Sequence, residues 1–203
     1  RTISRFTHIH QSTRDLVVKV KMLRLLGQKM GTCFQRCVGF DALNALYSVT
    51  YQVDQQHGTE YHQRLRRFLI HVQDNDLMSD GAMTDSKGDR SLAPSKQPDP
   101  DAYLHVVERR KEGIVVRGAK LHQTGSINSH EIIAMPTTAM REEDQDYAIA
   151  FAVPTDTPGL TYIFGRQTND ERKFGGEIDQ GNARFGFVGG EAMIVFDDVF
   201  VPW

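Results

Sequence analysis

The chain has 203 residues, of which 39% are hydrophobic and 25% are charged. This composition is typical of a globular protein that forms one large or two small domains. The 24 basic and 26 acidic residues leave a net charge of −2, which gives no electrostatic footprint for nucleic acid or an anionic membrane and favours small-molecule chemistry.

No apolar run approaches the roughly 20 residues that span a bilayer, and no signal-peptide pattern opens the chain, so we expect a cytoplasmic protein. The sequence begins at Arg1 and stops at Trp203, directly after an apolar strand pattern. These ends are typical of a fragment, and we expect the chain to be one.

The first 78 residues show helical spacing of apolar side chains. This spacing predicts one helix over residues 12–28 and a second over residues 33–53. His57-Gly58 then predicts a helix end, and Thr59 is expected to cap a third helix that ends near Asn75.

Polar side chains in this helical part offer two weak alternatives to a solvated surface. His8 and His10 alternate and have the spacing of a metal pair, but surface histidines are the favoured interpretation. Arg64, Arg66 and Arg67 are favoured as a solvated helix face, with a site for an anionic group such as the phosphates of CoA as the alternative.

Cys33 and Cys37 are the two cysteines of the chain. On a helix their side chains lie on one face, about 5–6 Å apart, which is poor geometry for a disulfide but suits two thiolates that each hold one iron. Spacing alone favours packing as small buried hydrophobes over metal binding.

After residue 80 the pattern changes to short β-rich runs. We expect strands over residues 103–107, 114–116, 131–135, 147–153, 160–164 and 192–196, with turn signals at 112–113, 117–118, 154–159 and 189–190. The acidic run 142–146 is expected to be a solvated loop. The sequence therefore predicts a helical domain over residues 1–78 and a β domain over residues 79–203.

Residues 83–90, Met-Thr-Asp-Ser-Lys-Gly-Asp-Arg, lie between these two parts. They supply donors, acceptors and cations of the kind that a flavin and its pyrophosphate need, and Gly88 permits close backbone approach. The chain has no G-x-G-x-x-G fingerprint and no phosphate-binding loop, which disfavours a Rossmann route to FAD. Without further information, a hairpin turn is the favoured interpretation of the segment.

Two further positions carry chemistry-bearing side chains. Thr124 follows a predicted strand and the polar pair His122-Gln123, while Glu191 follows two glycines and reads equally as a surface acid that begins a strand. Lys120, His122 and His130 form only a weak metal pattern.

Three segments carry a resemblance to a known family: GAMTDSKGDRSLAP at residues 81–94, the stretch from PDPDAYLHVV to HEIIAMPT at residues 98–137, and the closing FDDVFVPW. They resemble the 4-hydroxyphenylacetate 3-hydroxylase family over nearly the whole chain. The Cys33-x-x-x-Cys37 spacing is similar to that of its 4-hydroxybutyryl-CoA dehydratase branch rather than its flavin monooxygenases.

This resemblance implies an α+β, acyl-CoA dehydrogenase-like fold. An N-terminal helical domain would be followed by a β-barrel-like domain, and a C-terminal helical domain would be missing from this chain. The resemblance also implies a homotetramer.

The activity implied by the resemblance is dehydration of 4-hydroxybutyryl-CoA to crotonyl-CoA, with the vinylacetyl-CoA delta-isomerase activity that often accompanies it. The C3 hydrogen of this substrate is not acidic, so simple base-catalysed elimination fails. The family's radical mechanism overcomes this with FAD as a one-electron oxidant and a 4Fe-4S cluster as Lewis acid. Cys33 and Cys37 would hold two irons, with a histidine and a third cysteine beyond this chain.

The resemblance also assigns roles to individual residues. Thr124 would hydrogen-bond the N5 edge of the flavin, Glu191 would handle protons or orient the substrate, and Gln35 would point toward the substrate. The residues expected to bind FAD are Met83, Thr84, Asp85, Lys87, Gly88, Asp89, Arg90, His122, Gln123 and Thr124.

Two other functions compete with this interpretation. One is an FADH2-dependent aromatic 3-monooxygenase of the 4-hydroxyphenylacetate type, which has no cluster. The other is a noncatalytic scaffold that binds flavin or CoA. Iron bound together with flavin separates the dehydratase from both.

Overall fold

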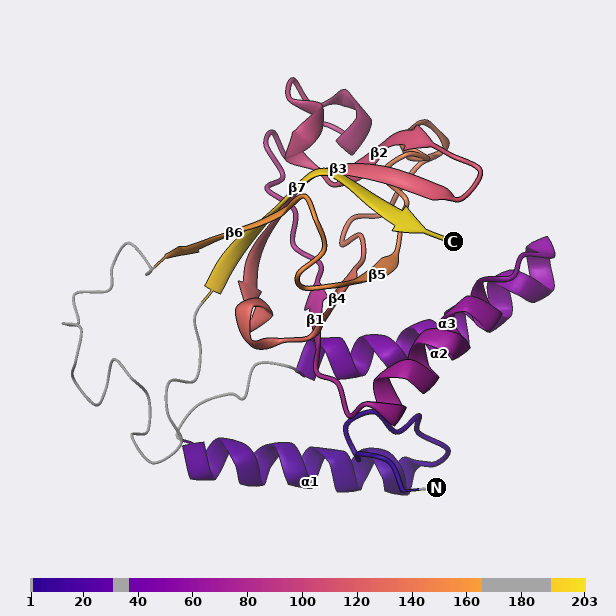
Figure 1. Ribbon diagram of the computed structural model, residues 1–203, viewed down its shortest axis with the longest axis vertical. Coiled ribbons are helices and arrows are strands. Elements are labelled where there is room, and N and C mark those ends of the chain that lie inside the picture. The colour runs from indigo at the N-terminus through magenta and orange to yellow at the C-terminus, as the bar shows by residue number, and fades with distance from the viewer. Residues whose placement is uncertain (1, 31–36, 166–190) are drawn as a thin grey trace. The chain divides into compact units, whose positions relative to one another are not determined.

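The computed structural model describes residues 2–30, 37–165 and 191–203 (Figure 1). Contacts between residues divide these into two compact units, with the described residues of the first unit at 2–78 and those of the second at 79–165 and 191–203. The first unit contains helices, and the second contains two sheets. The chain is therefore α+β, as its sequence predicts.

The first unit contains three helices, which are α1 (Thr13–Met30), α2 (Cys37–His57) and α3 (Tyr61–Asp74). Apolar side chains at helical spacing on α2 and α3 fill its interior, with Phe40, Leu43 and Val72 fully buried. The ring of Phe6 stacks on Phe40 at a centroid distance of 4.8 Å. The three predicted helices are thus confirmed where the structure describes them.

The surface of α3 carries the arginines for which a phosphate site was the alternative. Arg66 and Arg67 are exposed, as a solvated helix face requires. The guanidinium of Arg64 lies 5.8 Å from the centroid of the Tyr61 ring, a cation–π distance. None of the described helices is both long and apolar enough to cross a membrane.

The turn between α2 and α3 is held by the carboxylate of Asp54. Gly58, at φ 65°, lets the chain reverse direction after α2. Asp54 then accepts hydrogen bonds from the N–H groups of Tyr61 and His62, both at 2.9 Å, and from the Thr59 hydroxyl at 2.6 Å. The prediction that Thr59 caps α3 is therefore wrong, because the capping acceptor comes from the preceding helix.

Burial opposes ionisation of Asp54, but the hydrogen bonds from Thr59, His62 and Tyr61 lower its pKa below the ordinary value. We expect Asp54→Ala to reduce the free energy of unfolding, because α3 loses its cap. Thr59→Ala, which removes one of the three donors, should cost clearly less. Urea unfolding of both variants checks this, and equal losses would contradict the assignment of the cap to Asp54.

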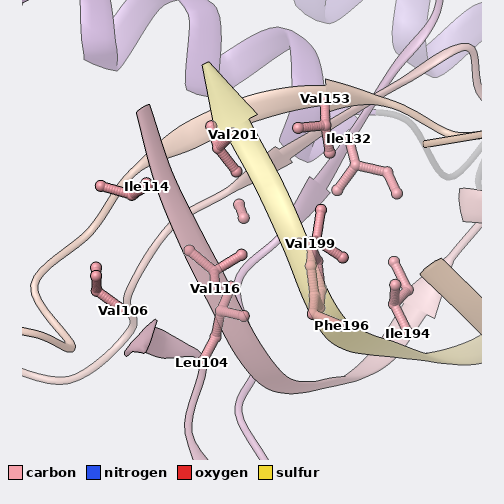
Figure 2. Close-up of a cluster of buried hydrophobic side chains, with 12 residues drawn as sticks. Leu104, Val106, Ile114, Val116, Ile132, Val153, Ile194, Phe196, Val199 and Val201 are labelled. Atoms are coloured by element: carbon pink, nitrogen blue, oxygen red, sulfur yellow. The ribbon is translucent and has the colours of Figure 1, made fainter. Parts of the chain in front are cut away.

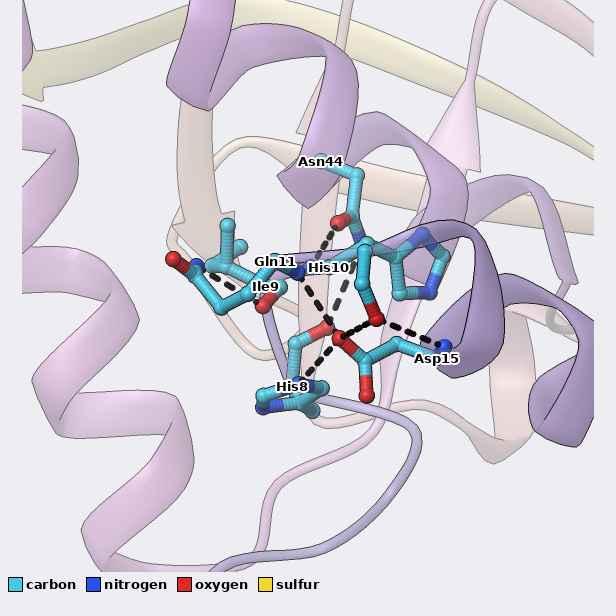
Figure 3. A network of polar contacts seen from close by, with 7 residues as sticks. His8, Ile9, His10, Gln11, Asp15 and Asn44 are labelled. Carbon is cyan, nitrogen blue, oxygen red and sulfur yellow. Dashed lines mark hydrogen bonds and ion pairs between the residues drawn. The ribbon is translucent and has the colours of Figure 1, made fainter.

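The segment before α1 is fastened to α2 by Asn44 (Figure 3). The Asn44 side chain accepts a hydrogen bond from the N–H of His10 at 2.8 Å and donates to the carbonyl of His8 at 3.4 Å. His8 Nε2 lies 3.6 Å from the Asp15 carboxylate. Both histidine rings are half-buried rather than on the open surface, and the Nε2 atom of His10 is buried without a hydrogen-bond partner among the described residues.

Burial, followed by the charge of Lys19, lowers the pKa of His10 below its ordinary value of 6.5. The unfolded chain therefore takes up this proton at a higher pH than the folded chain does, and stability falls as the pH drops below about 6.5. We expect wild type to lose more stability between pH 7.5 and pH 5.5 than His10→Gln does. Urea unfolding at both pH values measures the difference, and parallel pH profiles would refute it.

The second unit contains two sheets. In the three-stranded sheet, β4 (Glu131–Ala134) lies between β1 (Ser79–Ala82), to which it is parallel, and β5 (Phe151–Pro154), to which it is antiparallel. The four-stranded sheet is antiparallel throughout and has the order β2-β3-β7-β6. Its strands are β2 (His105–Arg109), β3 (Gly113–Thr124), β7 (Glu191–Pro202) and β6 (Leu160–Gly165). Strand pairing within the described residues gives two separate sheets, without the closed barrel that the term β-barrel-like suggests.

One apolar cluster joins the two sheets of this unit. Figure 2 shows Val116 of β3 and Phe196 and Val199 of β7 near one another, and Ile132 of β4 belongs to the same cluster. All four side chains are fully buried. This core fixes the positions of β3 and β7, the two longest described strands. These strands carry the polar side chains discussed below.

Several local predictions for this unit are wrong. The strand β1 was missed, and the strand expected over residues 147–153 is ordered as a strand only from Phe151. The turn predicted at Arg117-Gly118 lies inside β3, at a bulge where Gly118 has φ 132° and a Cβ would lie 2.6 Å from the Tyr103 carbonyl oxygen. Glycine is needed there for close approach of β3 to the backbone of Tyr103 and Leu104, just before β2, rather than for chain reversal.

The acidic run is also more ordered than expected. Residues Glu142–Asp144 form a short 3-10 helix, and Asp144 is only 1% exposed. Its carboxylate accepts hydrogen bonds from the N–H groups of Ser95 at 3.0 Å and Arg141 at 3.1 Å. The prediction of a solvated loop is therefore wrong for Asp144, because these bonds compensate the burial of its charge.

Candidate functional site

The segment 83–90 follows β1 and is tied at its start to β3. The N–H of Leu121 donates to the carbonyl of Thr84 at 2.7 Å, and Asp85 and Lys120 form an isolated antiparallel bridge. On the other side, the N–H of Met135 donates to the carbonyl of Ala82 at 3.1 Å. The start of the segment is therefore bonded to β3, and the residue before it is bonded to the residue that follows β4.

A buried ion pair lies beneath this start. The Nζ atom of Lys120 is 2.7 Å from Asp85 Oδ1, and the two side chains are 3% and 1% exposed. Lys120 Nζ also donates to the carbonyls of Met83 at 3.0 Å and Met135 at 2.9 Å. Burial lowers the pKa of Lys120, and the Asp85 carboxylate opposes that shift. Asp85, which was expected to contact a cofactor, thus points inward to a lysine.

The outer half of the segment is fastened by Gln97. Its side-chain oxygen accepts from the N–H of Asp89 at 3.0 Å, while its side-chain nitrogen donates to the carbonyls of Asp89 at 2.8 Å and Leu92 at 3.2 Å. The carboxylate of Asp89 in turn accepts from the N–H and hydroxyl of Ser91, which lower its pKa. The loop thus keeps one shape because its polar groups satisfy one another.

Between the parts of the loop held by Lys120 and by Gln97, two backbone amides have no protein acceptor among the described residues, and we call them open amides. Lys87 and Gly88 both have positive φ, at 69° and 43°, and Gly88 and Arg90 are exposed. Within the described residues, the main-chain N–H groups of Lys87 and Gly88 donate to no protein acceptor. Open amides in a left-handed turn, beside the cations of Lys87 and Arg90, make a surface suited to an anionic group.

The second group of polar side chains lies at the far end of β3 and the start of β7. Thr124 pairs directly with Glu191 across the two strands. His122 Nδ1 is 3.3 Å from Glu191 Oε2, and the His122 side chain is 69% exposed. Three residues singled out by the sequence therefore come together, although 69 positions separate His122 from Glu191.

A β-bulge determines which of these side chains face outward. The pairing of β3 with β7 shifts between Lys120 and Gln123, and within this shift His122 takes φ 56°. Lys120 is buried before the bulge, His122 is exposed within it, and Gln123 is buried after it. In a regular strand Lys120, His122 and Thr124 would share one face, so the bulge separates the buried lysine from the exposed histidine.

Other predicted residues are not brought together, or lie outside the described residues. Lys120 and His130 do not join His122 in a metal site, and the described residues contain no group of three His, Cys, Asp or Glu side chains suited to a metal ion. Cys33 and Gln35 lie outside the described residues, and Cys37 is known only as the first residue of α2. The sequence missed Lys120 as an anchor, although a lysine between apolar residues of a strand is a signal of a paired buried charge.

Gly88 provides a test of how tightly the loop is packed. A Cβ added there would lie 2.4 Å from the side-chain oxygen of Gln97, whereas one added at Gly58, also at positive φ, would meet nothing within 4 Å. We expect Gly58→Ala to cost about 1 kcal/mol of stability from backbone strain alone. Gly88→Ala should cost about 1–2 kcal/mol more, because the hydrogen bonds of Gln97 must also be disturbed. Urea unfolding measures both, and an equal loss would show that Gln97 yields freely.

Comparison with known proteins gives relatives over the full chain. The family model described as 4-hydroxyphenylacetate 3-hydroxylase N terminal matches residues 1–203. The 4-hydroxybutyryl-CoA dehydratase/vinylacetyl-CoA-Delta-isomerase of Clostridium aminobutyricum is 61% identical over 204 residues, covering 100% of this chain and 41% of that protein. The 4-hydroxyphenylacetate 3-monooxygenase oxygenase component of Thermus thermophilus is 33% identical over 168 residues, which are 80% of this chain and 33% of that protein.

Solved structures agree with these relatives. An oxygen-tolerant archaeal 4-hydroxybutyryl-CoA dehydratase from N. maritimus is 54% identical with a TM-score of 0.92, covering 99% of this chain and 40% of that one. The oxygenase component of 4-hydroxyphenylacetate 3-monooxygenase complexed with FAD is 26% identical with a TM-score of 0.77, covering 100% of this chain and 41% of that one. The chain thus spans about two fifths of these longer proteins, and it belongs to the 4-hydroxyphenylacetate 3-hydroxylase family.

Proposed function

We propose that this chain is the N-terminal and middle part of an enzyme that dehydrates 4-hydroxybutyryl-CoA to crotonyl-CoA and isomerises vinylacetyl-CoA. The observation that carries the proposal is the 61% identity to the clostridial dehydratase over the whole chain. Identity to the monooxygenase component from Thermus is 33% over 80% of the chain, so the dehydratase is the better supported of the two activities. Since the chain spans 41% of the dehydratase, the activity belongs to the longer protein.

FAD is the first cofactor of this proposal, and the residues of the second unit fit it. Open amides at Lys87 and Gly88, beside the cations of Lys87 and Arg90, suit the pyrophosphate. Thr124 presents a half-buried hydroxyl at the end of β3. The FAD-bound monooxygenase component, at a TM-score of 0.77, supports flavin binding by this fold.

The residues expected to bind FAD divide into those that can touch the cofactor and those that are buried. We propose that seven of the expected residues, all exposed or half-exposed, touch the cofactor directly. They are Thr84, Lys87, Gly88, Asp89, Arg90, His122 and Thr124. Met83 is half-buried and gives its carbonyl to Lys120, while Asp85 and Gln123 are buried. We assign Asp85 and Gln123 to the support of the loop and strand rather than to direct contact.

A 4Fe-4S cluster is the second proposed cofactor, and Cys33 and Cys37 would hold it through their thiolates. The support is their four-residue spacing in the sequence, the position of Cys37 as the first residue of α2, and the similarity to the dehydratases. The remaining ligands would come from the rest of the longer protein. Bound together, the flavin would supply one-electron oxidation and the cluster a Lewis acid for loss of the hydroxyl.

The residues of this chain would bind, orient and move protons around the substrate. Glu191 presents a carboxylate that is held by His122 at 3.3 Å and can accept a proton or orient the acyl chain. Gln35, between the two cysteines, would point its amide toward the substrate. A homotetramer, which the family resemblance implies, and a cytoplasmic location remain predictions.

The test is the iron, acid-labile sulfide and flavin content of the full-length protein, purified without oxygen. We expect about four irons and one FAD per chain, as for one 4Fe-4S cluster and one flavin. Cys33→Ala and Cys37→Ala should each abolish both iron binding and dehydration, whereas Val38→Ala, one residue further along α2, should retain both. Wild-type protein with flavin but no iron would instead support the monooxygenase, and wild-type protein with neither cofactor would leave a scaffold.

A further inference from the structure

Lys120 is a buried charged residue to which the proposed chemistry gives no role. Its ammonium group has three donors and meets three acceptors from separate parts of the chain: Asp85 Oδ1, the carbonyl of Met83 and the carbonyl of Met135. Met83 and Asp85 lie at the start of the loop, and Met135 directly follows β4. One side chain therefore joins β3 to the loop and to the neighbouring sheet.

Stability alone is a poor explanation for this arrangement. Replacing a buried ion pair by apolar residues of similar volume is often neutral or stabilising, so the charges are not needed to fill the interior. An ammonium group does something that an apolar side chain cannot, because it binds two main-chain carbonyls at fixed distances. It thereby sets the position and direction of the backbone at Met83 and Met135.

The carboxylate of Asp85 completes the arrangement. It compensates the buried charge of Lys120 through Oδ1, while its Oδ2 atom is buried without a hydrogen-bond partner in the described part of the chain. Oδ2 therefore gives no direct support to the loop. Within the pair, Lys120 Nζ is the group that anchors the backbone of the loop.

We propose that Lys120 is a positioning residue for FAD binding, acting through the backbone of Met83–Asp85. By fixing the start of the loop, it places the open amides of Lys87 and Gly88 and the half-buried Thr84 before any cofactor arrives. This inference rests on the proposed binding of FAD and adds a residue that does not touch the cofactor.

The bulge in β3 extends this role to the second polar group. Lys120 and His122 are two positions apart on the same strand, and the bulge turns the first inward and the second outward. The same short stretch therefore anchors the loop from beneath and presents His122 to Glu191. A shift of Lys120 would therefore displace both the loop at residues 83–90 and the side chain of His122.

The experiment measures FAD affinity and unfolding stability of full-length apoprotein, with flavin fluorescence as the binding signal. Lys120→Met should lower both, because it leaves the Asp85 charge buried and unpaired. The double variant Lys120→Met/Asp85→Asn removes both charges and should recover the part of the stability that the unpaired carboxylate costs. Its FAD affinity should stay weaker than that of wild type by about tenfold or more, since two carbonyls still lack their donor.

A matched control is Lys19→Met on α1. Lys19 is as buried as Lys120 and bonds Asp41 at 2.6 Å, but Asp41 is largely exposed and the pair is in the other unit. The FAD affinity of the Lys19→Met variant should equal that of wild type. Hydrogen exchange without flavin should be faster at residues 83–90 in the double variant than in wild type and unchanged in the control.

The outcomes are distinct. A double variant that regains both stability and wild-type FAD affinity, with unchanged exchange at residues 83–90, would overturn the role of Lys120 and leave the proposed function intact. A wild-type protein that binds no FAD would overturn the proposed function, and this inference with it. Weak FAD binding and fast loop exchange in a stable double variant would support the inference.

Discussion

The second unit depends on the requirement that a charge removed from water must be fully compensated. Lys120 meets this requirement with three acceptors drawn from the loop and from the end of β4, so its compensation and the fastening of the loop are the same set of contacts. The loop can then leave amides open at Lys87 and Gly88, because its shape is already fixed at both ends by Lys120 and Gln97. The contacts that shape this surface are thus made within the chain itself.

The long pair β3 and β7 carries two kinds of residue on one frame. Apolar side chains such as Val116 and Phe196 fill the core, and the polar pair Thr124 and Glu191 closes one end of the ladder. The bulge between Lys120 and Gln123 separates these environments, since it interrupts the strict alternation of side chains in β3 at His122. A regular strand would direct Lys120 and His122 to the same side, and either the anchor or the exposed histidine would be lost.

Local patterns predicted those features that depend on local periodicity. The three helices, the helix end at Gly58 and the strand at Glu131 follow from apolar spacing and turn residues, and segment 83–90 stood out by its composition. The cap from Asp54, the burial of Asp144 and the inward direction of Asp85 depend on partners that local patterns do not pair with them. The meeting of His122 with Glu191 needs strand register across 69 positions. These features could not be predicted from periodicity, because only tertiary contacts create them.

The single amide of Gln97 has a chemical consequence for the loop. Its oxygen faces a main-chain N–H, and its nitrogen faces the carbonyls of Asp89 and Leu92. A carboxylate would have almost the same shape but no donor, so it would place an oxygen against two other oxygens. Spontaneous deamidation of Gln97 would therefore release the outer half of the loop without any change in volume. The outer half of the loop thus depends on the donor and acceptor of one amide rather than on the size of that side chain.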